Sequence, residues 1–599
     1  MFQGIVQAEV GNAMPKGTLY LHNGASKDAP THAKGAPAPA GPYLSNAEIA
    51  DRLTSIAHLL AAQKANPFKV KAYRRAADTV KTLPESVGEL VRSDEDLTQY
   101  SGIGRSISNS IRELVLTGRL RQLEALRSAV GPEIAAITEY PRLDPKLVVR
   151  VYKKLGIGSV AGLREKLESG EIREKLGTRI DQHVRQALAE THEMLLYDAD
   201  EVATGVSEFL LKRCGVGRVQ ATGDYRRRAE VVGEIAFLIE SDNFPAVVSK
   251  LQSYGGRADL LNSAESTAVF KLAPGILLRI DMASRNKWGV ALILSTGSEN
   301  HLKKLQAATF DLKELLSSKD SYPDESAVYR KLGMSFIEPE LREGHDEVEL
   351  ARRGALPVLV SAKDIRGELH AHTVSSDGAN TIEQMAAAAR AKNYEYIGIS
   401  DHSQSLKIAG GLSEDDLWQQ IRYIDKLNEK TGSIRILKSA EVDILVDGTL
   451  DYSNELLREL DYTVCSIHSR FGLSKADQTN RILCAMDNPH FTILGHATGR
   501  LLLKRPGYEI EIERVVEHAK ATGCFFEINS SPDRLDLSAA NARLARQAGV
   551  KIAVCTDAHS TRELDYINLG VDQARRAGME RPSILNCLSW PELRGVLKR

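Results

Sequence analysis

Long apolar runs, closely spaced cysteines and an excess of charge of one sign are all missing from this chain of 599 residues. No stretch approaches the roughly 18 uninterrupted apolar residues that a bilayer-spanning helix needs, and the N-terminus lacks the basic, apolar and small-residue order of a secretory signal. The six cysteines are scattered, so we expect reduced thiols and a cytoplasmic protein without membrane attachment. Because 78 basic and 79 acidic side chains nearly balance, any nucleic-acid-binding surface must be local.

Local composition divides the chain into segments of different character. Residues 1–44 are rich in glycine, alanine and proline, which predicts a flexible tail. From residue 45 to about 195, apolar residues recur at three- and four-residue spacings, which predicts an all-α region. Between residues 198 and 283, short β-type runs such as Val231–Ile239 and Ala268–Ile280 alternate with helical stretches, which predicts a mixed α/β segment.

The C-terminal part alternates strand-like and helix-like stretches, behind a polar, proline-containing segment at residues 336–356. Such alternation favours a parallel α/β barrel. We therefore expect a multidomain fold with an all-α N-terminal region, an α/β middle and a C-terminal α/β barrel. The expected barrel strands include Tyr394–Ser400, Asp461–Ser466, Phe525–Asn529 and Lys551–Thr556.

Histidines and carboxylates cluster just after these strand-like runs. Eight of the fifteen histidines lie between His370 and His559. His370 and His372 stand at i and i+2 of an extended stretch, so both imidazoles point the same way and can bind one ion. In an α/β barrel, the C-terminal strand ends converge on one face and bring distant donors together. The candidate metal ligands are His370, His372, Asp377, His402, Glu441, His468, His496, Asp557 and His559.

The residue types in this set point to a particular chemistry. Imidazole and carboxylate donors together suit Zn²⁺, Mn²⁺ or Fe²⁺. Nine ligands exceed what one ion needs, and ions that share a carboxylate can hold a phosphate ester while activating water. The pattern therefore indicates phosphate-ester hydrolysis at a site with several ions.

Across residues 365–599, these motifs resemble the polymerase and histidinol phosphatase (PHP) domain. The resemblance implies a distorted TIM-like barrel that holds three divalent ions, Mn²⁺ or Zn²⁺, with Glu441 as the bridging carboxylate. It also implies that Arg500 and Arg534 are catalytic groups that pair with a bound phosphate. Carried over position by position, the ions would be held by His370, His372, Glu441 and Asp557, by Glu441, His468 and His496, and by Asp377, His402 and His559.

The N-terminal half carries two features of DNA-binding proteins. Residues 100–107 read as a tight Gly-x-Gly turn between helices and look like a helix-hairpin-helix motif, whose backbone amides can approach a phosphate. Residues 64–75 hold five basic residues, no acidic residue and interleaved aromatics, which suits a surface that follows phosphates, although a solvated helix face is the plain alternative. The candidate DNA-binding residues are Lys64, Lys69, Lys71, Arg74, Arg75, Gly102, Ile103, Gly104 and Arg105.

Together, these stretches resemble the N-terminal and fingers regions of bacterial family X DNA polymerases, and the likeness continues to residue 343. The resemblance implies a nucleotidyltransferase-like palm ahead of the PHP domain. It divides the chain into a tail (1–44), a helix-hairpin-helix domain (45–128), a fingers-like domain (129–196), a palm and thumb (197–335), a linker (336–364) and the PHP domain (365–599).

The palm departs from the family's pattern, in which a Gly-Ser turn binds the triphosphate and three aspartates hold two Mg²⁺ ions. Asp224 places a carboxylate where the triphosphate would rest, and like charges repel at short range. The Asp-x-Asp pair corresponds to Glu234 and Ala236, and a methyl group cannot bind Mg²⁺. The third aspartate aligns with Arg279. We therefore predict that the polymerase site is degenerate.

The sequence thus predicts a metal-dependent DNA phosphodiesterase. The resemblance implies 3′–5′ exonuclease activity, with abasic-site cleavage as a further activity, on gapped or 3′-ended duplex and single-stranded DNA. Three alternatives stay open: an active DNA-directed DNA polymerase/3′–5′ exonuclease, a histidinol-phosphatase-like enzyme of small molecules, and a non-catalytic DNA-binding scaffold. The hairpin motif and the basic run argue against the small-molecule phosphatase, and the complete ligand set argues against the scaffold.

Overall fold

The structure is a computed structural model that describes residues 44–63, 65–83, 85–128, 151, 154–157, 160–177, 180–181, 184–185, 193–273, 276–309, 312–430 and 434–597. The predicted tail (all but Leu44), Lys64 and much of the fingers-like segment 129–196 lie outside the described residues. Within the described part of the chain, no helix combines the length and the apolar character that crossing a membrane would require.

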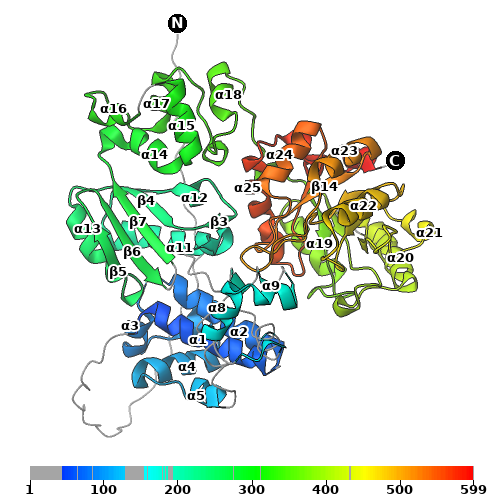
Figure 1. The fold of residues 1–599 in the computed structure, drawn as a ribbon, viewed down its shortest axis with the longest axis horizontal. Helices are drawn as coiled ribbons and strands as arrows, with labels where there is room; N and C mark the ends of the chain where they lie inside the picture. Colours follow the sequence, from blue (N-terminus) through cyan, green and yellow to red (C-terminus); the bar gives the residue numbers. More distant parts are fainter. Residues whose placement is uncertain are drawn as a thin grey trace, which may run out of the picture. The chain divides into compact units, whose positions relative to one another are not determined.

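The N-terminal region is built from helices (Figure 1), of which those within residues 46–128 share one apolar core and those within residues 160–176 share a second, smaller one. Helix α1 begins with a capping box, in which Ser45 and Glu48 each accept a hydrogen bond from the other's backbone amide. Helix α2 begins at Pro67, behind the Asn66 cap. The helices are α1 (Asn46–Ala62), α2 (Pro67–Thr82), α3 (Val87–Arg92), α4 (Arg105–Thr117) and α5 (Arg121–Ser128), followed by α8 (Val160–Glu168) and α9 (Glu171–Leu176).

The middle segment contains a five-stranded sheet in the order β2-β4-β7-β6-β5. Strands β4 and β7 are parallel, and the other neighbours are antiparallel. The strands are β2 (Arg218–Thr222), β4 (Ile235–Glu240), β5 (Asp259–Ser263), β6 (Thr267–Ala273) and β7 (Ile276–Met282). Helices α11 (Leu196–Phe209) and α13 (Phe244–Leu251) share an apolar core with the sheet, and α12 (Gly223–Arg226) follows β2.

The run expected at Val231–Ile239 is divided in the structure. Its first residues form β3 (Val231–Val232), which pairs with β1 (Met194–Leu195) outside the main sheet. The chain bends at Gly233 before β4 begins. This bend places Glu234 directly before β4, where its side chain lines a pocket of the palm.

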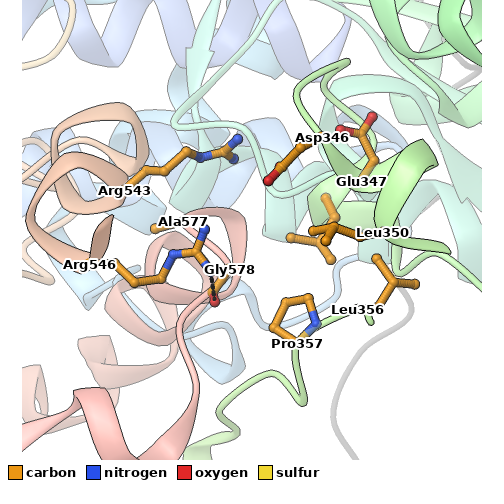
Figure 2. Close-up of a pocket in the computed structure, with 10 residues that line it drawn as sticks. Asp346, Glu347, Leu350, Leu356, Pro357, Arg543, Arg546, Ala577 and Gly578 are labelled. Atoms are coloured by element: carbon orange, nitrogen blue, oxygen red, sulfur yellow. Dashed lines mark hydrogen bonds between the residues drawn. The ribbon is translucent and has the colours of Figure 1, made fainter. Parts of the chain in front are cut away.

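Helices α14 (Trp288–Thr296), α15 (Glu299–Ala308), α16 (Leu312–Ser317), α17 (Glu325–Lys331) and α18 (Glu347–Arg353) follow the sheet. Much of the expected linker 336–364 is folded here, since Ile337, Leu341 and Val348 are buried in one core with Val290 of α14. A hollow of about 20 Å³ separates α18 from the last domain, where Arg546 donates to the carbonyl of Gly578 (Figure 2). Because this volume holds about one water molecule, the hollow is a small gap between packed elements and not a ligand site.

The last domain is a closed parallel barrel. Strands β8 (Gly367–Ala371), β9 (Tyr396–Ile399) and β10 (Arg435–Lys438) form one parallel sheet. Strands β11 (Glu441–Asp443), β12 (Val464–Ser466), β13 (Ile493–Leu494), β14 (Phe525–Asn529) and β15 (Ile552–Cys555) form a second one. Bridges Ala371–Ala558 and His402–Glu441 join the two sheets at both seams. The intervening helices include α19 (Ile382–Ala391), α20 (Glu414–Lys430), α22 (Lys475–Met486), α23 (Ile512–Thr522), α24 (Ala539–Ala548) and α25 (Ile567–Arg576).

The predicted fold class is confirmed: the chain has an all-α N-terminal region, a mixed α/β middle and a C-terminal α/β domain with parallel strands. The barrel arrangement matters for function because parallel strands present all their C-terminal ends on one face.

Candidate metal centre

Most of the nine predicted ligands lie at or just beyond the C-terminal ends of the barrel strands. Within or next to β8 are His370 and His372, and Asp377 lies in the loop that follows. Glu441 opens β11, and Asp557 and His559 come directly after β15. The remaining three, which follow β9, β12 and β13 respectively, are His402, His468 and His496.

These side chains form three overlapping groups, within each of which the candidate ligand atoms lie within 4.8 Å of one another. Glu441 is shared by two groups, and so are His372 and His402. His496 is not in any of the three, but its Nε2 lies 2.8 Å from Glu441 Oε1. The groups are His370, His372, Glu441 and Asp557; His372, Asp377, His402 and His559; and His402, Glu441 and His468.

The Glu441 carboxylate lies at the centre of this arrangement. Its Oε2 lies 2.7 Å from His402 Nδ1, and its Oε1 lies 3.3 Å from His468 Nε2. A carboxylate with imidazoles on both oxygens can bridge two ions. Glu441 is 1% exposed, so only ligands inside the barrel mouth can reach it.

Several potential metal-ligand atoms in the cluster are buried without a hydrogen-bond partner. Among the described residues of the cluster, three buried imidazole nitrogens have no hydrogen-bond partner: His370 Nε2, His372 Nδ1 and His496 Nδ1. Each buried polar atom left unpaired costs about 1–3 kcal/mol. Divalent ions would satisfy these atoms together, so the donor set fits a metal cluster.

A second layer of carboxylates orients the imidazoles. Glu527 Oε1 lies 2.7 Å from His370 Nδ1, and Asp443 Oδ1 lies 2.7 Å from His468 Nδ1. With Nδ1–H donated outward, each imidazole turns the lone pair of Nε2 toward the cluster, which fixes the ligand geometry. Sequence reasoning missed both acids. The signals were Asp443 at i+2 from Glu441 on one strand, and a lone acid within the apolar strand β14.

The cluster holds its acids in the charged form. Burial alone would raise the pKa of Glu441, but the imidazoles of His468, His402 and His370 together hold it well below its usual range. Burial and the charge of His402 lower the pKa of His372 to about 4, so this imidazole is neutral and able to bind a cation. Although burial alone would lower them, nearby carboxylates raise the pKa of His402 to about 10 and the pKa values of His468 and His559 to about 9, so without ions these imidazoles hold protons that metal binding would release.

Two candidate ligands lie in strained backbone conformations. His496 has φ of 25° and Asp557 has φ of 54°, both in the left-handed region that favours glycine. Such positions cost on the order of 1–3 kcal/mol each and gather at functional sites. Here the bends turn both side chains back into the barrel mouth.

The two predicted phosphate-binding arginines have different surroundings. Arg534 Nε lies 3.5 Å from Asp557 Oδ2, and although burial alone would lower its pKa, the charges of Asp557 and Glu441 raise it. Arg500 points elsewhere: its Nη1 lies 2.9 Å from Glu230 Oε2, and its Nε donates to the Arg534 carbonyl at 2.9 Å. Arg534 is therefore the better placed of the two to meet a phosphate at the cluster.

A second pocket, of about 350 Å³, lies in the palm and is lined by Asp224, Glu234 and Arg279. The parallel register of β4 and β7 pairs Ala236 with Arg279. The Arg279 guanidinium lies between two carboxylates, 2.9 Å from Glu234 Oε1 and 2.6 Å from Asp281 Oδ2. Asp224 is paired with Arg227. A fixed cation thus lies among the groups that the family's pattern assigns to Mg²⁺.

The hairpin region brings the turn and the basic helix together. Arg75 donates to Ser101 Oγ at 2.9 Å, and Gly102 has φ of 90° with no room for a Cβ, which would lie 2.8 Å from Arg75 Cγ. Gly104 caps α4 without a side-chain bond, so the first amides of the helix are open to an anion. The other described basic candidates, all exposed, are Lys69, Lys71, Arg74 and Arg105.

Known proteins match the same parts of the chain. The helix-hairpin-helix domain family matches residues 44–120, and the PHP domain family matches residues 368–531. The DNA polymerase/3′-5′ exonuclease PolX of Bacillus subtilis (strain 168) is 32% identical over 570 residues, which cover 92% of this chain and 99% of the relative. A "Probable phosphatase" of Thermoanaerobacter sp. (strain X514) is 31% identical over 37% of this chain and 89% of its own length.

The fold and the site define a polymerase-like chain that ends in a PHP phosphoesterase domain. Given similarity along nearly its full length, the chain belongs to the bacterial PolX family of family X DNA polymerases. The predicted resemblance is thereby confirmed, and the chain is placed among DNA-processing enzymes of the polymerase/exonuclease kind.

Proposed function

We propose that this protein is a divalent-metal-dependent DNA 3′–5′ exonuclease whose palm no longer supports DNA synthesis. The observation that carries this proposal is the convergence of nine imidazole and carboxylate donors at the barrel mouth. Membership of the PolX family and the matching helix-hairpin-helix domain support DNA as the substrate. Gapped or 3′-ended duplex and single-stranded DNA are the proposed forms.

Three ions, Mn²⁺ or Zn²⁺, would supply water activated for attack on phosphorus and would offset the charge of the phosphate. The chain's own residues prepare that site. Glu441 stays anionic between the imidazoles, and Glu527 and Asp443 hold His370 and His468 in place. Arg534 provides a fixed cation that can pair with the phosphate as its charge develops.

The charges in the palm pocket disfavour binding of magnesium ions and of a nucleotide. Arg279 already forms ion pairs with Glu234 and Asp281, so a divalent ion brought there would meet a positive charge at short range. Ala236 offers no ligand atom in place of an aspartate. The Asp224 carboxylate lines the same pocket and occupies Arg227, so this arginine is not free to bind a triphosphate. Together these features support loss of polymerase activity.

The test compares hydrolysis of 3′-recessed, gapped, single-stranded and abasic-site DNA with hydrolysis of histidinol phosphate, each with Mn²⁺ and with a chelator. We expect Mn²⁺-dependent 3′–5′ degradation of DNA, additional cleavage at the abasic site, and no turnover of the small phosphate. The His468→Ala variant should lose activity, whereas the control His518→Ala, on helix α23, should keep it.

Primer extension with added deoxynucleotides is measured in the same reactions, with the nuclease inactivated by His468→Ala. Extension by that variant would show that the palm is active and would refute the loss of synthesis. Preference for histidinol phosphate over DNA would instead support the small-molecule phosphatase, and DNA binding without hydrolysis would support the scaffold.

A further inference from the structure

Arg500 connects the metal centre to the palm. Besides the Arg534 carbonyl, its guanidinium donates to the carbonyl of Leu535, so it holds two successive peptide groups. Both groups lie in the loop between β14 and α24, which carries the Arg534 side chain toward Asp557. The direction of Arg534 therefore depends on where Arg500 is fixed.

Glu230, a palm residue just before β3, fixes Arg500. Its Oε2 lies 2.9 Å from Arg500 Nη1, and its Oε1 accepts a hydrogen bond of 3.3 Å from the amide of Ala539, the first residue of α24. A carboxylate at a helix N-terminus is stabilised by the helix dipole. The side chains of Arg500 and Glu230 are only 17% and 20% exposed, so the pair is partly shielded from water and salt.

The same loop has a second anchor in the palm. The Leu535 side chain is fully buried in the apolar cluster that contains Ile235 and Phe237 of β4. Leu535 also has φ of 41°, a conformation that needs support from its surroundings. The loop that bears Arg534 is thus held from the palm by an ion pair and by apolar packing.

We propose that Glu230 is a positioning residue of the phosphoesterase site, which acts through Arg500 to aim Arg534 at a bound phosphate. This proposal rests on the proposed function of the PHP site. If Glu230 loses its charge, Arg500 is left partly buried without its carboxylate partner and turns toward water, which releases both carbonyls. Arg534 then loses its direction, although every candidate metal ligand is still present.

The test uses the full chain loaded with Mn²⁺ and the variants Glu230→Gln and Arg500→Lys. Glutamine keeps the size of the side chain and an acceptor for Ala539. Lysine keeps the ion pair but cannot bond both carbonyls. The matched control is Glu208→Gln, since Glu208 forms an exposed palm ion pair with Lys212.

Two readouts separate positioning from folding and from DNA affinity. One is hydrolysis of bis(4-nitrophenyl) phosphate, a diester too small to use the DNA-binding surface. The other is binding of inorganic phosphate measured by calorimetry, which requires no turnover. For both variants we expect kcat and phosphate affinity to fall about 10- to 100-fold, as for other residues that orient active-site groups. Bound Mn²⁺, measured by mass spectrometry, should stay at the wild-type level.

The double variant Glu230→Gln/Arg500→Lys should lose no more than either single variant, because both break one connection. Wild-type kcat and phosphate affinity in Glu230→Gln, or losses that multiply in the double variant, would overturn the proposal. If the wild type binds phosphate without hydrolysing diesters and Glu230→Gln weakens that binding, the proposed function fails while the positioning role stands. A wild type that neither binds nor hydrolyses overturns both.

Discussion

The second-layer carboxylate of Glu527 offers a sharp test of the metal centre. Its two oxygens serve two different ligands: Oε1 lies 2.7 Å from His370 Nδ1, and Oε2 accepts a 2.7 Å hydrogen bond from the backbone amide of His496. Glu527 is fully buried, so water cannot replace either bond. A Glu527→Gln substitution offers one oxygen where two are needed. Whichever way the amide turns, its NH₂ group faces another donor, and one ligand loses its anchor.

The expected loss follows from that geometry. A hydrogen bond to a charged group contributes about 1.5–3 kcal/mol, and about 1.4 kcal/mol corresponds to a tenfold change in an equilibrium constant. The Mn²⁺ concentration for half-maximal exonuclease activity should therefore rise by roughly 10- to 150-fold. Saturating Mn²⁺ should restore most of kcat, because all nine proposed ligands are intact.

The assay is degradation of a 3′-recessed duplex over a Mn²⁺ titration, with circular dichroism to confirm folding. The control is Glu517→Gln, since Glu517 is exposed on helix α23. If Glu527→Gln shows the Mn²⁺ dependence and metal content of the wild type, Glu527 does not orient ligands and the assignment of the cluster is wrong.

Three further predictions concern the metal, the DNA and pH. Chelation should abolish hydrolysis and lower the thermal unfolding midpoint, both reversed by Mn²⁺, because ligands that bind only the native state stabilise it; an unchanged midpoint in differential scanning fluorimetry would speak against bound ions. Replacing the four exposed basic residues of α2 by alanine should reduce the slope of log K against log salt by about 0.9 for each lost phosphate contact, measured by fluorescence anisotropy, whereas an unchanged slope would place the DNA elsewhere. Burial lowers the pKa of His301 below 6.5. Burial alone would raise the pKa of its partner Glu347, but the bond from His301 and the bonds from backbone amides together lower it, so both groups release protons on folding. Stability of the chelated protein, measured by urea unfolding, should therefore fall as pH drops below 6.5, and this fall should be smaller in His301→Gln; equal pH profiles would contradict the shift.

Most of the candidate ligands could be predicted because they follow short apolar runs. His468 follows a buried strand. Asp557 comes directly after the expected run Lys551–Thr556, most of which forms β15. A parallel barrel then forces these ends onto one face. Local sequence carries that information because burial of the strand and placement of the ligand are decided by the same few residues.

The partners of the arginines could not be predicted in this way. Arg500 and Glu230 are far apart in sequence, and no local pattern marks Glu230 among the many acidic residues of the chain. The expected linker raised the same difficulty. Because its sequence is polar and contains prolines, it gives no sign that Ile337 and Leu341 are buried. These two residues pack in one apolar core with helices such as α14. Long-range contacts of this kind are set by tertiary packing and not by periodicity.

In the palm pocket, ion pairs between side chains hold the acidic residues without a bound metal ion. Three carboxylates gathered for Mg²⁺ repel one another until the ions arrive, and like unit charges about 4 Å apart cost about 4 kcal/mol at an effective dielectric constant near 20. Here Arg279 lies between Glu234 and Asp281, and Thr267 donates to Asp281 at 2.7 Å. These contacts offset part of the repulsion between the two carboxylates without metal or nucleotide. The loss of polymerase ligands that we propose would therefore also remove a source of instability, and the segment just before β3 would support the proposed phosphoesterase site through Glu230.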